Sequence, residues 1–229
     1  NTLYQLLSMV KSKSTILEKA ETLLFIPDLL SFFLTGNKAC EFTIASTSQM
    51  LLAGRGTWAY DLLNELGIPV EILPEIIDSC SSAGTLQKSV QEELGVKEIP
   101  VIAVASHDTG SAVISAPLDN ADDAYISSGT WSLLGAECEK PVINETTLKL
   151  NYTNEGGINR TIRLLKNIMG LWVYQECRRA WKKEGIRISY DEMDALAQAA
   201  APFQAFIDVD DEPFFSPGYM PQKVMAYCE

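Results

Sequence analysis

The stretch ASHDTGSAV, residues 105–113, contains the single histidine of the chain, His107, with Asp108 beside it. Its first residue is also the last of residues 99–105, a continuous apolar run with the length of a strand buried on both faces. Ligands of α/β proteins bind at loops that follow the carboxyl ends of strands. A carboxylate there can accept the proton of a substrate hydroxyl as that hydroxyl attacks phosphorus or a carbonyl carbon. Asp108 is therefore a candidate general base.

The same residues also have a purely structural interpretation. Small residues over 109–115 predict a helix, which Asp108 could cap while His107 fills the turn. A Ser-His-Asp hydrolase is disfavoured, because Ser106, His107 and Asp108 are consecutive and cannot align as nucleophile, base and orienting group. The chain also has no G-x-S-x-G elbow. Position alone leaves both capping and catalysis open for Asp108.

A second candidate is the turn Ser128-Gly129-Thr130, which joins two short strands expected within 124–135. Tight turns rich in glycine and hydroxyl residues can present backbone N–H groups to an anion, although many such turns bind nothing. The chain contains neither a G-x-x-x-x-G-K-[ST] loop nor a G-x-G-x-x-G fingerprint. A nucleotide site here would thus be of another kind.

The third candidate region is NEGG at 154–157, followed by LLKN at 164–167. The paired glycines predict either a loop that lines a site or a plain turn. A helix is expected over 167–183. On it, Asn167 and Gln175 would lie about 12 Å apart along the axis and about 80° apart around it. They could serve one elongated ligand, or Asn167 could simply cap the helix and Gln175 face solvent.

Helix and strand signals alternate, which predicts an α/β protein. A polar, turn-prone segment at 117–123 predicts a boundary that separates a domain at 1–118 from one at 119–229. The expected helices are 2–10, 28–35 between Pro27 and Gly36, 58–66, 109–115, 167–183 and 191–201, the last capped by Asp191, with another beginning near the carboxyl end. The expected strands are 99–105, the pair within 124–135, 163–165 and 203–209.

Composition excludes several classes of partner. The net charge of −12 argues against non-specific binding to nucleic acid or to an anionic membrane. The longest apolar run, 23–34, is interrupted by Pro27 and Asp28 and is too short to cross a bilayer. The cysteines are scattered without C-x-x-C spacing, which indicates reduced thiols and neither a zinc site nor a disulfide framework: Cys40, Cys80, Cys138, Cys177 and Cys228.

In this order and spacing, SHDTGSA, AYISSGTWSLLG, TNEGG and LLKNIMGLWVYQE resemble the rhamnulokinase branch of the FGGY family of carbohydrate kinases. The resemblance covers essentially the whole chain. It implies the actin-like ATPase, ribonuclease H-like, two-domain fold. It also implies a cytoplasmic enzyme of rhamnose catabolism, which uses ATP and Mg²⁺ to convert L-rhamnulose to L-rhamnulose 1-phosphate.

The resemblance also implies a role for each candidate residue. Asp108 would be the general base, and His107 and Thr109 would help to hold the sugar. Thr130, with Gly129 beside it, would contact the phosphates of ATP. Asn167 would lie against the sugar and Gln175 beside the nucleotide.

Two features of the family are missing from this sequence: the D-x-G phosphate-binding turn near the start and the glycine-rich adenosine motif near the end. We therefore expect a central fragment, with 1–118 the last part of the sugar-binding domain and 119–229 the first part of the nucleotide-binding domain. Alone, it should bind ATP poorly and turn over slowly or not at all. A kinase for another ketose and a non-catalytic sugar-binding protein remain the alternatives.

Overall fold

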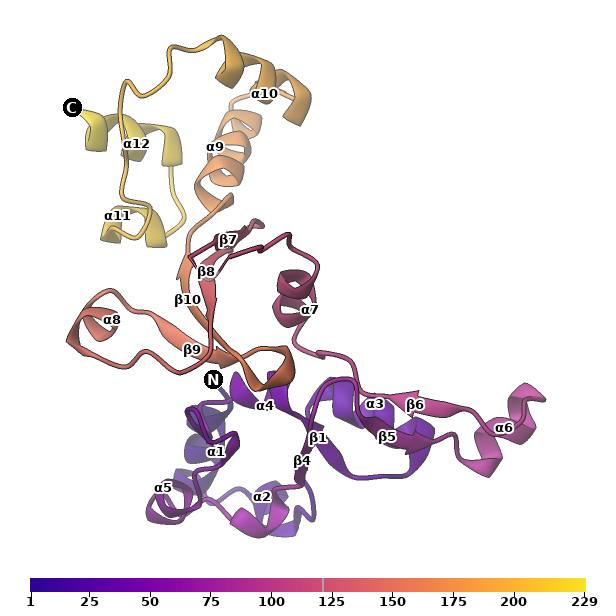
Figure 1. Ribbon diagram of the computed structural model, residues 1–229. Coiled ribbons are helices and arrows are strands. Elements are labelled where there is room, and N and C mark those ends of the chain that lie inside the picture. The colour runs from indigo at the N-terminus through magenta and orange to yellow at the C-terminus, as the bar shows by residue number, and fades with distance from the viewer. Residues whose placement is uncertain (121) are drawn as a thin grey trace. The chain divides into compact units, whose positions relative to one another are not determined.

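The computed structural model describes residues 1–120 and 122–229 (Figure 1). Helices and strands alternate along the chain, as the α/β prediction requires. The contacts form two compact units: unit 1 comprises residues 1–125 and 135–165, and unit 2 comprises 126–134 and 166–229. Ala121, within the expected boundary segment, lies outside the described residues. The domain boundary at 118/119 stays a prediction.

Unit 1 begins with a helical region that carries short strands. Its helices are α1 (Thr2–Lys11), α2 (Thr15–Lys19), α3 (Ile26–Thr35), α4 (Phe42–Ser46) and α5 (Tyr60–Glu65), followed by the 3-10 turn η1 (Val70–Ile72). Strand β1 (Ala39–Glu41) pairs in parallel with β4 (Glu75–Ile77), and β2 (Leu51–Leu52) pairs with β3 (Thr57–Trp58). The helices expected at 2–10 and 28–35 are confirmed, and the one expected at 58–66 forms over the shorter range of α5, because Trp58 belongs to β3. Gly36 ends α3 with φ +77°, a conformation that favours glycine.

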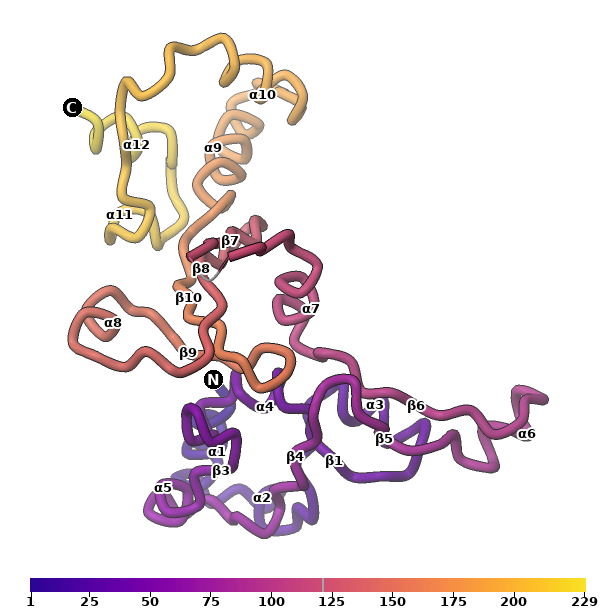
Figure 2. The backbone as a smooth tube through the Cα atoms, viewed as in Figure 1, coloured from indigo at the N-terminus to yellow at the C-terminus, as the bar shows by residue number. Residues whose placement is uncertain are grey.

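An apolar core holds this region together. Its buried members include Leu3, Leu6, Met50, Trp58 and Leu63. The indole N–H of Trp58 donates to the Pro74 carbonyl at 2.8 Å, so the one polar atom of this buried side chain is satisfied. The amino terminus packs beside the end of α4, where Leu3 N donates to Ser48 O at 3.1 Å (Figure 2). The core thus fixes α4, which contacts the loop of Asp108.

The next segment forms the hairpin of β5 (Ser82–Thr85) and β6 (Pro100–Ile102), with α6 (Lys88–Leu94) between them. Helix α3 lies against this hairpin (Figure 1). The expected strand at 99–105 is shorter, and its predicted burial on both faces is wrong: Ile102 and Val104 are 52% and 64% exposed. One neighbouring strand and one helix bury only part of such a run. Helix α7 (Asp108–Ile114) follows, as predicted.

A four-stranded sheet has the order β7-β8-β10-β9. Its strands are β7 (Ala124–Ser127), β8 (Ser132–Cys138), β9 (Thr153–Gly156) and β10 (Ile162–Ile168), with α8 (Glu145–Lys149) before β9 and the turn η2 (Ile158–Arg160) after it. The predicted strand pair within 124–135 and the strand at 163–165 are confirmed. Strands β9 and β10 pair in antiparallel register, which places Arg163 opposite Glu155.

Unit 2 is completed by helices α9 (Trp172–Lys183), α10 (Tyr190–Ala199), α11 (Glu212–Phe215) and α12 (Met220–Cys228). Val173, Phe214 and Met220 form its buried core, and α9 packs against α12. None of the helices in the described part of the chain has the length and apolar composition of a membrane span.

Three predictions for this region are wrong. Helix α9 begins at Trp172 rather than Asn167, because residues 162–168 extend strand β10 and Gly170 turns the chain with φ +52°. No strand forms over 203–209 in the described chain, where no neighbouring strand pairs with the segment and Phe203 is 81% exposed. Helix α10 is capped by Ser189 in a capping box with Glu192, and not by Asp191.

Gly170 allows a prediction about stability. A Cβ at this position would contact Ser132 Oγ and lie 2.7 Å from Gly129 O, in addition to requiring a left-handed conformation. Gly185, also in unit 2, has φ +87° but no atom within 4 Å of its Cβ position. Gly185→Ala should thus lower the free energy of unfolding by about 1–2 kcal/mol, the cost of the left-handed backbone conformation alone. Gly170→Ala should lower the free energy of unfolding further, measured by urea denaturation, and equal losses would contradict the close approach.

Candidate active site

Asp108 is the first residue of α7, and its carboxylate points to solvent. Its Oδ1 accepts hydrogen bonds from Thr109 N at 2.7 Å and from Thr109 Oγ1 at 3.4 Å. The side chain is 96% exposed, and no Lys or Arg in the described part of the chain forms an ion pair with it. The N-cap position belongs to His107, without a side-chain capping bond, so Asp108 is not the N-cap residue considered as an alternative. An exposed carboxylate without a Lys or Arg partner is available to accept a proton.

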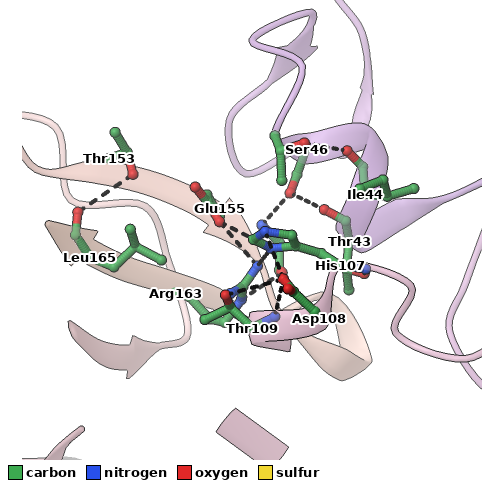
Figure 3. Close-up of polar contacts among 12 residues, drawn as sticks. Thr43, Ile44, Ser46, His107, Asp108, Thr109, Thr153, Glu155, Arg163 and Leu165 are labelled. Atoms are coloured by element: carbon green, nitrogen blue, oxygen red, sulfur yellow. Dashed lines mark hydrogen bonds and ion pairs between the residues drawn. The ribbon is translucent and has the colours of Figure 1, made fainter. Parts of the chain in front are cut away.

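His107 lies between this carboxylate and two charged residues of the β9–β10 hairpin (Figure 3). Its Nδ1 is 2.9 Å from Arg163 Nη2 and 3.4 Å from Glu155 Oε2. Its Nε2 is 3.6 Å from Asp108 Oδ1. Burial lowers the pKa of His107 below its ordinary value, and the Arg163 charge acts in the same direction, although Glu155 opposes it. The ring is therefore neutral at pH 7.

The position of the proton on this neutral ring follows from the chemistry of its neighbours. A guanidinium group can only donate hydrogen bonds. Arg163 Nη2 therefore requires Nδ1 of His107 to be the acceptor, which leaves the proton on Nε2. That N–H is on the side of the ring nearer Asp108. The hairpin thereby determines which face of His107 donates toward the candidate base.

Arg163 itself is fully buried, and its charge is compensated within the hairpin. Its Nε donates to Gly156 O at 2.9 Å, and its Nη2 is 3.2 Å from Glu155 Oε2. The two residues face each other across β9 and β10. The NEGG stretch is thus strand followed by turn, and its glutamate contributes to the site. Sequence reasoning missed Arg163, whose signal was a cationic residue within the otherwise apolar start of a strand, Ile162-Arg163-Leu164-Leu165.

The loop before Asp108 is also bonded to α4. Thr43 Oγ1 accepts a hydrogen bond from His107 N at 3.2 Å and donates to Glu41 Oε2 at 2.6 Å. Glu41, the N-cap of α4, is 2% exposed. Burial alone would raise the pKa of Glu41, but hydrogen bonds from Ser79, Thr43 and Ser106 outweigh it and hold this pKa below its ordinary value. Sequence reasoning gave no signal for Glu41.

Within unit 2, the structure brings together three of the residues assigned to the nucleotide. Thr130 Oγ1 donates to Gln175 Oε1 at 3.3 Å. The carbonyl groups of Gly129 and Thr130 accept from Leu171 N at 3.0 Å and Trp172 N at 3.1 Å, at the start of α9. The turn between β7 and β8 is therefore fixed to this helix, while the Thr130 side chain remains exposed.

Asn167 is placed differently from the prediction. It lies on strand β10 and is exposed, whereas Gln175 belongs to α9. The helical spacing expected between the two residues is therefore wrong. The sequence alone favoured one long helix because two apolar pairs, Ile168 with Trp172 and Cys177 with Trp181, have the helical spacing of four residues. The pairing of β10 with its neighbours overrides that pattern.

A cavity of about 850 Å³ in unit 1 does not include residues 107–109 in its lining. It is surrounded by residues 49 and 51–58 together with Phe42, Tyr152, Gly156 and Arg160, among others. Among residues 1–120 and 122–229, no three His, Cys, Asp or Glu side chains are arranged to hold a metal ion. The candidate site is thus defined by the chemistry of its side chains rather than by an enclosed volume.

His107 provides a direct test of this geometry because the chain has one histidine. An NMR titration should show a single imidazole with a pKa below its ordinary 6.5 and with the neutral form protonated at Nε2. The unfolded chain would bind this proton more readily than the folded one. The stability contributed by His107 is thus complete above pH 6.5 and is lost as the pH falls toward the folded-state pKa.

Glu155→Gln removes a charge that raises this pKa, so the midpoint should fall further. Glu139→Gln, which replaces an exposed carboxylate on the same unit, should leave it unchanged. A pKa above 6.5, or protonation of the neutral ring at Nδ1, would refute the arrangement of Arg163 and His107.

Comparison with known proteins identifies the family of the chain. Residues 1–115 match the N-terminal domain of the FGGY family of carbohydrate kinases, and residues 124–227 match its C-terminal domain. Among curated relatives, the chain is 43% identical over its whole length to the rhamnulokinase of Bacteroides thetaiotaomicron, of which it covers 46%. It is 42% identical to the rhamnulokinase of Oceanobacillus iheyensis, of which it covers 47%. The chain therefore spans about half the length of these relatives.

Solved structures support the same fold. The xylulose kinase of Rhodospirillum rubrum superimposes with a TM-score of 0.73 at 13% identity, over 88% of this chain and 41% of that one. A ligand-bound xylulose kinase of Lactobacillus acidophilus gives 0.71 at 20% identity, over 87% of this chain and 40% of that one. The fold is that of these two-domain sugar kinases, and the chain belongs to the FGGY family of carbohydrate kinases.

Proposed function

We propose that this chain is part of an enzyme that phosphorylates L-rhamnulose with ATP to give L-rhamnulose 1-phosphate in the cytoplasm. The observation that carries the proposal is the Asp108 carboxylate, which is exposed, has no Lys or Arg partner in the described chain and is held by Thr109. Its neighbour His107 is neutral and has its N–H on the side nearer Asp108. The 43% identical rhamnulokinase supports the choice of sugar.

The proposed reaction needs one proton acceptor and two positioned substrates. Asp108 accepts the proton of the terminal sugar hydroxyl as its oxygen bonds to the γ-phosphorus of ATP, and the bond from that phosphorus to the ADP oxygen breaks. The proton later passes from Asp108 to solvent. Thr109 holds Oδ1 through its N–H, so Oδ2 is the oxygen that we assign to the sugar hydroxyl. His107 and Asn167 are proposed to contact other hydroxyl groups of the sugar.

The nucleotide is assigned to unit 2. We propose that Thr130 Oγ1 and Gly129 contact the phosphates and that Gln175, which accepts from Thr130, orients this hydroxyl. Mg²⁺ enters with ATP and neutralises the phosphate charge. Mg²⁺ would need few protein ligands here, because the phosphates of ATP coordinate it. The domain assignments at 1–118 and 119–229 belong to this proposal.

The test is an ADP-release assay with L-rhamnulose, ATP and Mg²⁺. We expect little or no turnover from these 229 residues alone, because the relatives are about twice as long. A chimera in which the chain replaces the matched 228 residues of the Bacteroides thetaiotaomicron relative should be active. There, Asp108→Asn should reduce kcat by about 10²-fold to 10⁴-fold or more through loss of the base. Asp61→Asn, an exposed first-turn carboxylate of α5, should have no effect.

The outcomes separate the competing functions. Activity of the chimera with another ketose but not with L-rhamnulose would retain the family and replace the substrate. A folded chimera that binds sugar without turnover would favour a non-catalytic binding protein. Full activity of the Asp108→Asn chimera would refute the assignment of the base.

A further inference from the structure

Glu41 is a buried carboxylate that belongs to none of the motifs and is not part of the proposed reaction. It lies at the end of β1, where it is 2% exposed. We propose that Glu41 is a positioning residue, which fixes the loop Ser106–Asp108 so that Asp108 is correctly placed for proton transfer. This inference rests on the proposed function of Asp108.

The hydrogen bonds of Glu41 converge from three segments. From the catalytic loop, Ser106 donates to Oε2 twice, through its N–H at 3.1 Å and its hydroxyl at 2.9 Å. From α4, Thr43 Oγ1 donates to the same oxygen at 2.6 Å and Ile44 N at 3.2 Å. Ser79, which follows β4, donates its hydroxyl to Oε1. One side chain therefore joins β1, α4, the segment after β4 and the loop before α7.

The charge of Glu41 is compensated by hydrogen-bond donors alone. Buried carboxylates are usually paired with a cation, because burial of an isolated charge costs several kcal/mol. No Lys, Arg or His forms an ion pair with Glu41 among the residues that the structure describes. Hydrogen bonds to an ionised acceptor are about twice as strong as neutral ones. Each donor is thus held more firmly than it would be by an amide or a hydroxyl.

Glu41 controls two successive amides of the loop, one directly and one through Thr43. Because the Thr43 hydroxyl donates its proton to Glu41, its oxygen lone pairs can accept the N–H of His107 at 3.2 Å (Figure 3). Ser106 and His107 are the two residues immediately before Asp108. Their fixed amides determine where the chain enters α7 and hence where the Asp108 side chain begins.

A simple helix cap does not explain this arrangement. Capping of α4 needs only the bond from Ile44 N to the Glu41 side chain. The two bonds from Ser106 instead connect residues 65 positions apart in the sequence. Three of the bonds to Oε2 therefore lie outside the capping interaction. Two come from Ser106 in the loop, and the third comes from the Thr43 hydroxyl that holds His107.

The experiment uses the 229-residue chain and measures amide hydrogen exchange by NMR. Glu41→Ala should accelerate exchange at the Ser106 and His107 amides by about tenfold or more. The Ser106 amide loses its bond to the carboxylate, and the His107 amide is bonded to a Thr43 hydroxyl that Glu41 no longer holds. Glu41→Gln keeps the shape but not the charge, so it should give a smaller acceleration and a shifted His107 imidazole signal. Glu75→Gln, an exposed carboxylate on the adjacent strand β4, should change neither.

A merely structural role would accelerate all amides of unit 1 alike. Equal acceleration at Leu63 and Ile68, which lie in the core away from the loop, would overturn the proposal. If Glu41→Ala does not fold, Glu41→Gln decides the question by the same comparison. In the active chimera, Glu41→Gln should lower kcat at least about tenfold and leave KM for ATP unchanged, and an unchanged kcat would also overturn it.

The two proposals fail in different ways. If Asp108→Asn keeps full activity, the proposed base is wrong whatever the exchange data show. If Asp108→Asn abolishes activity while Glu41→Gln leaves both exchange and kcat unchanged, the base stands and Glu41 is not its positioning residue.

Discussion

The buried guanidinium of Arg163 is the charge on which the arrangement of the site depends. A cation removed from water is tolerated only where anions and carbonyl groups replace its hydration. Glu155 and the Gly156 carbonyl, both from the opposite strand, provide this replacement at Nη2 and Nε. The remaining donor of Nη2 is directed at His107, so the buried guanidinium determines the tautomer of a ring in the loop before Asp108.

The loop before Asp108 is consequently held from two sides. The β9–β10 hairpin acts on the imidazole of His107 through a cation, whereas β1 and α4 act on the backbone through the anion of Glu41. The two contacts differ in what they fix: Arg163 determines a proton position, and Glu41 determines a chain path. Neither residue forms an ion pair with Asp108 among the described residues, so the carboxylate remains exposed and uncompensated. Such separation suits the proposed role of Asp108 as a base, which must change its protonation state without disturbing the residues that hold it.

The sequence was informative where local patterns determine structure, and much less so where distant segments meet. The apolar run before Asp108 and the glycine-containing turn at Gly129 were sufficient to predict strand β6 and the pair β7 and β8, beside which the candidate residues lie. The meeting of Thr130 with Gln175 was suggested only by the family resemblance, since the two are 45 residues apart. Arg163 and Glu41 were missed because their function comes from partners 56 and 65 residues away, which no spacing rule reveals.

The errors have a related physical origin. Asn167 was assigned to a helix because the apolar pattern around it has a helical period, yet the pairing of β10 prevails over this pattern. Residues 203–209 have the composition of a strand but lack a neighbour in the described chain, and a strand without a partner leaves its backbone groups unpaired. Propensity thus decides the outcome only where the tertiary surroundings permit it.

The two candidate sites are built on the same principle. In unit 1, the residues before α7 are bonded through their amides while Asp108 projects into solvent. In unit 2, the carbonyl groups of Gly129 and Thr130 hold the start of α9 while the Thr130 hydroxyl stays exposed. Phosphoryl transfer requires little covalent chemistry from a protein and depends mainly on alignment of the reacting atoms. A fixed backbone that carries an exposed functional group suits the proposed phosphoryl transfer, because the side chain would reach its substrate from a constant starting point.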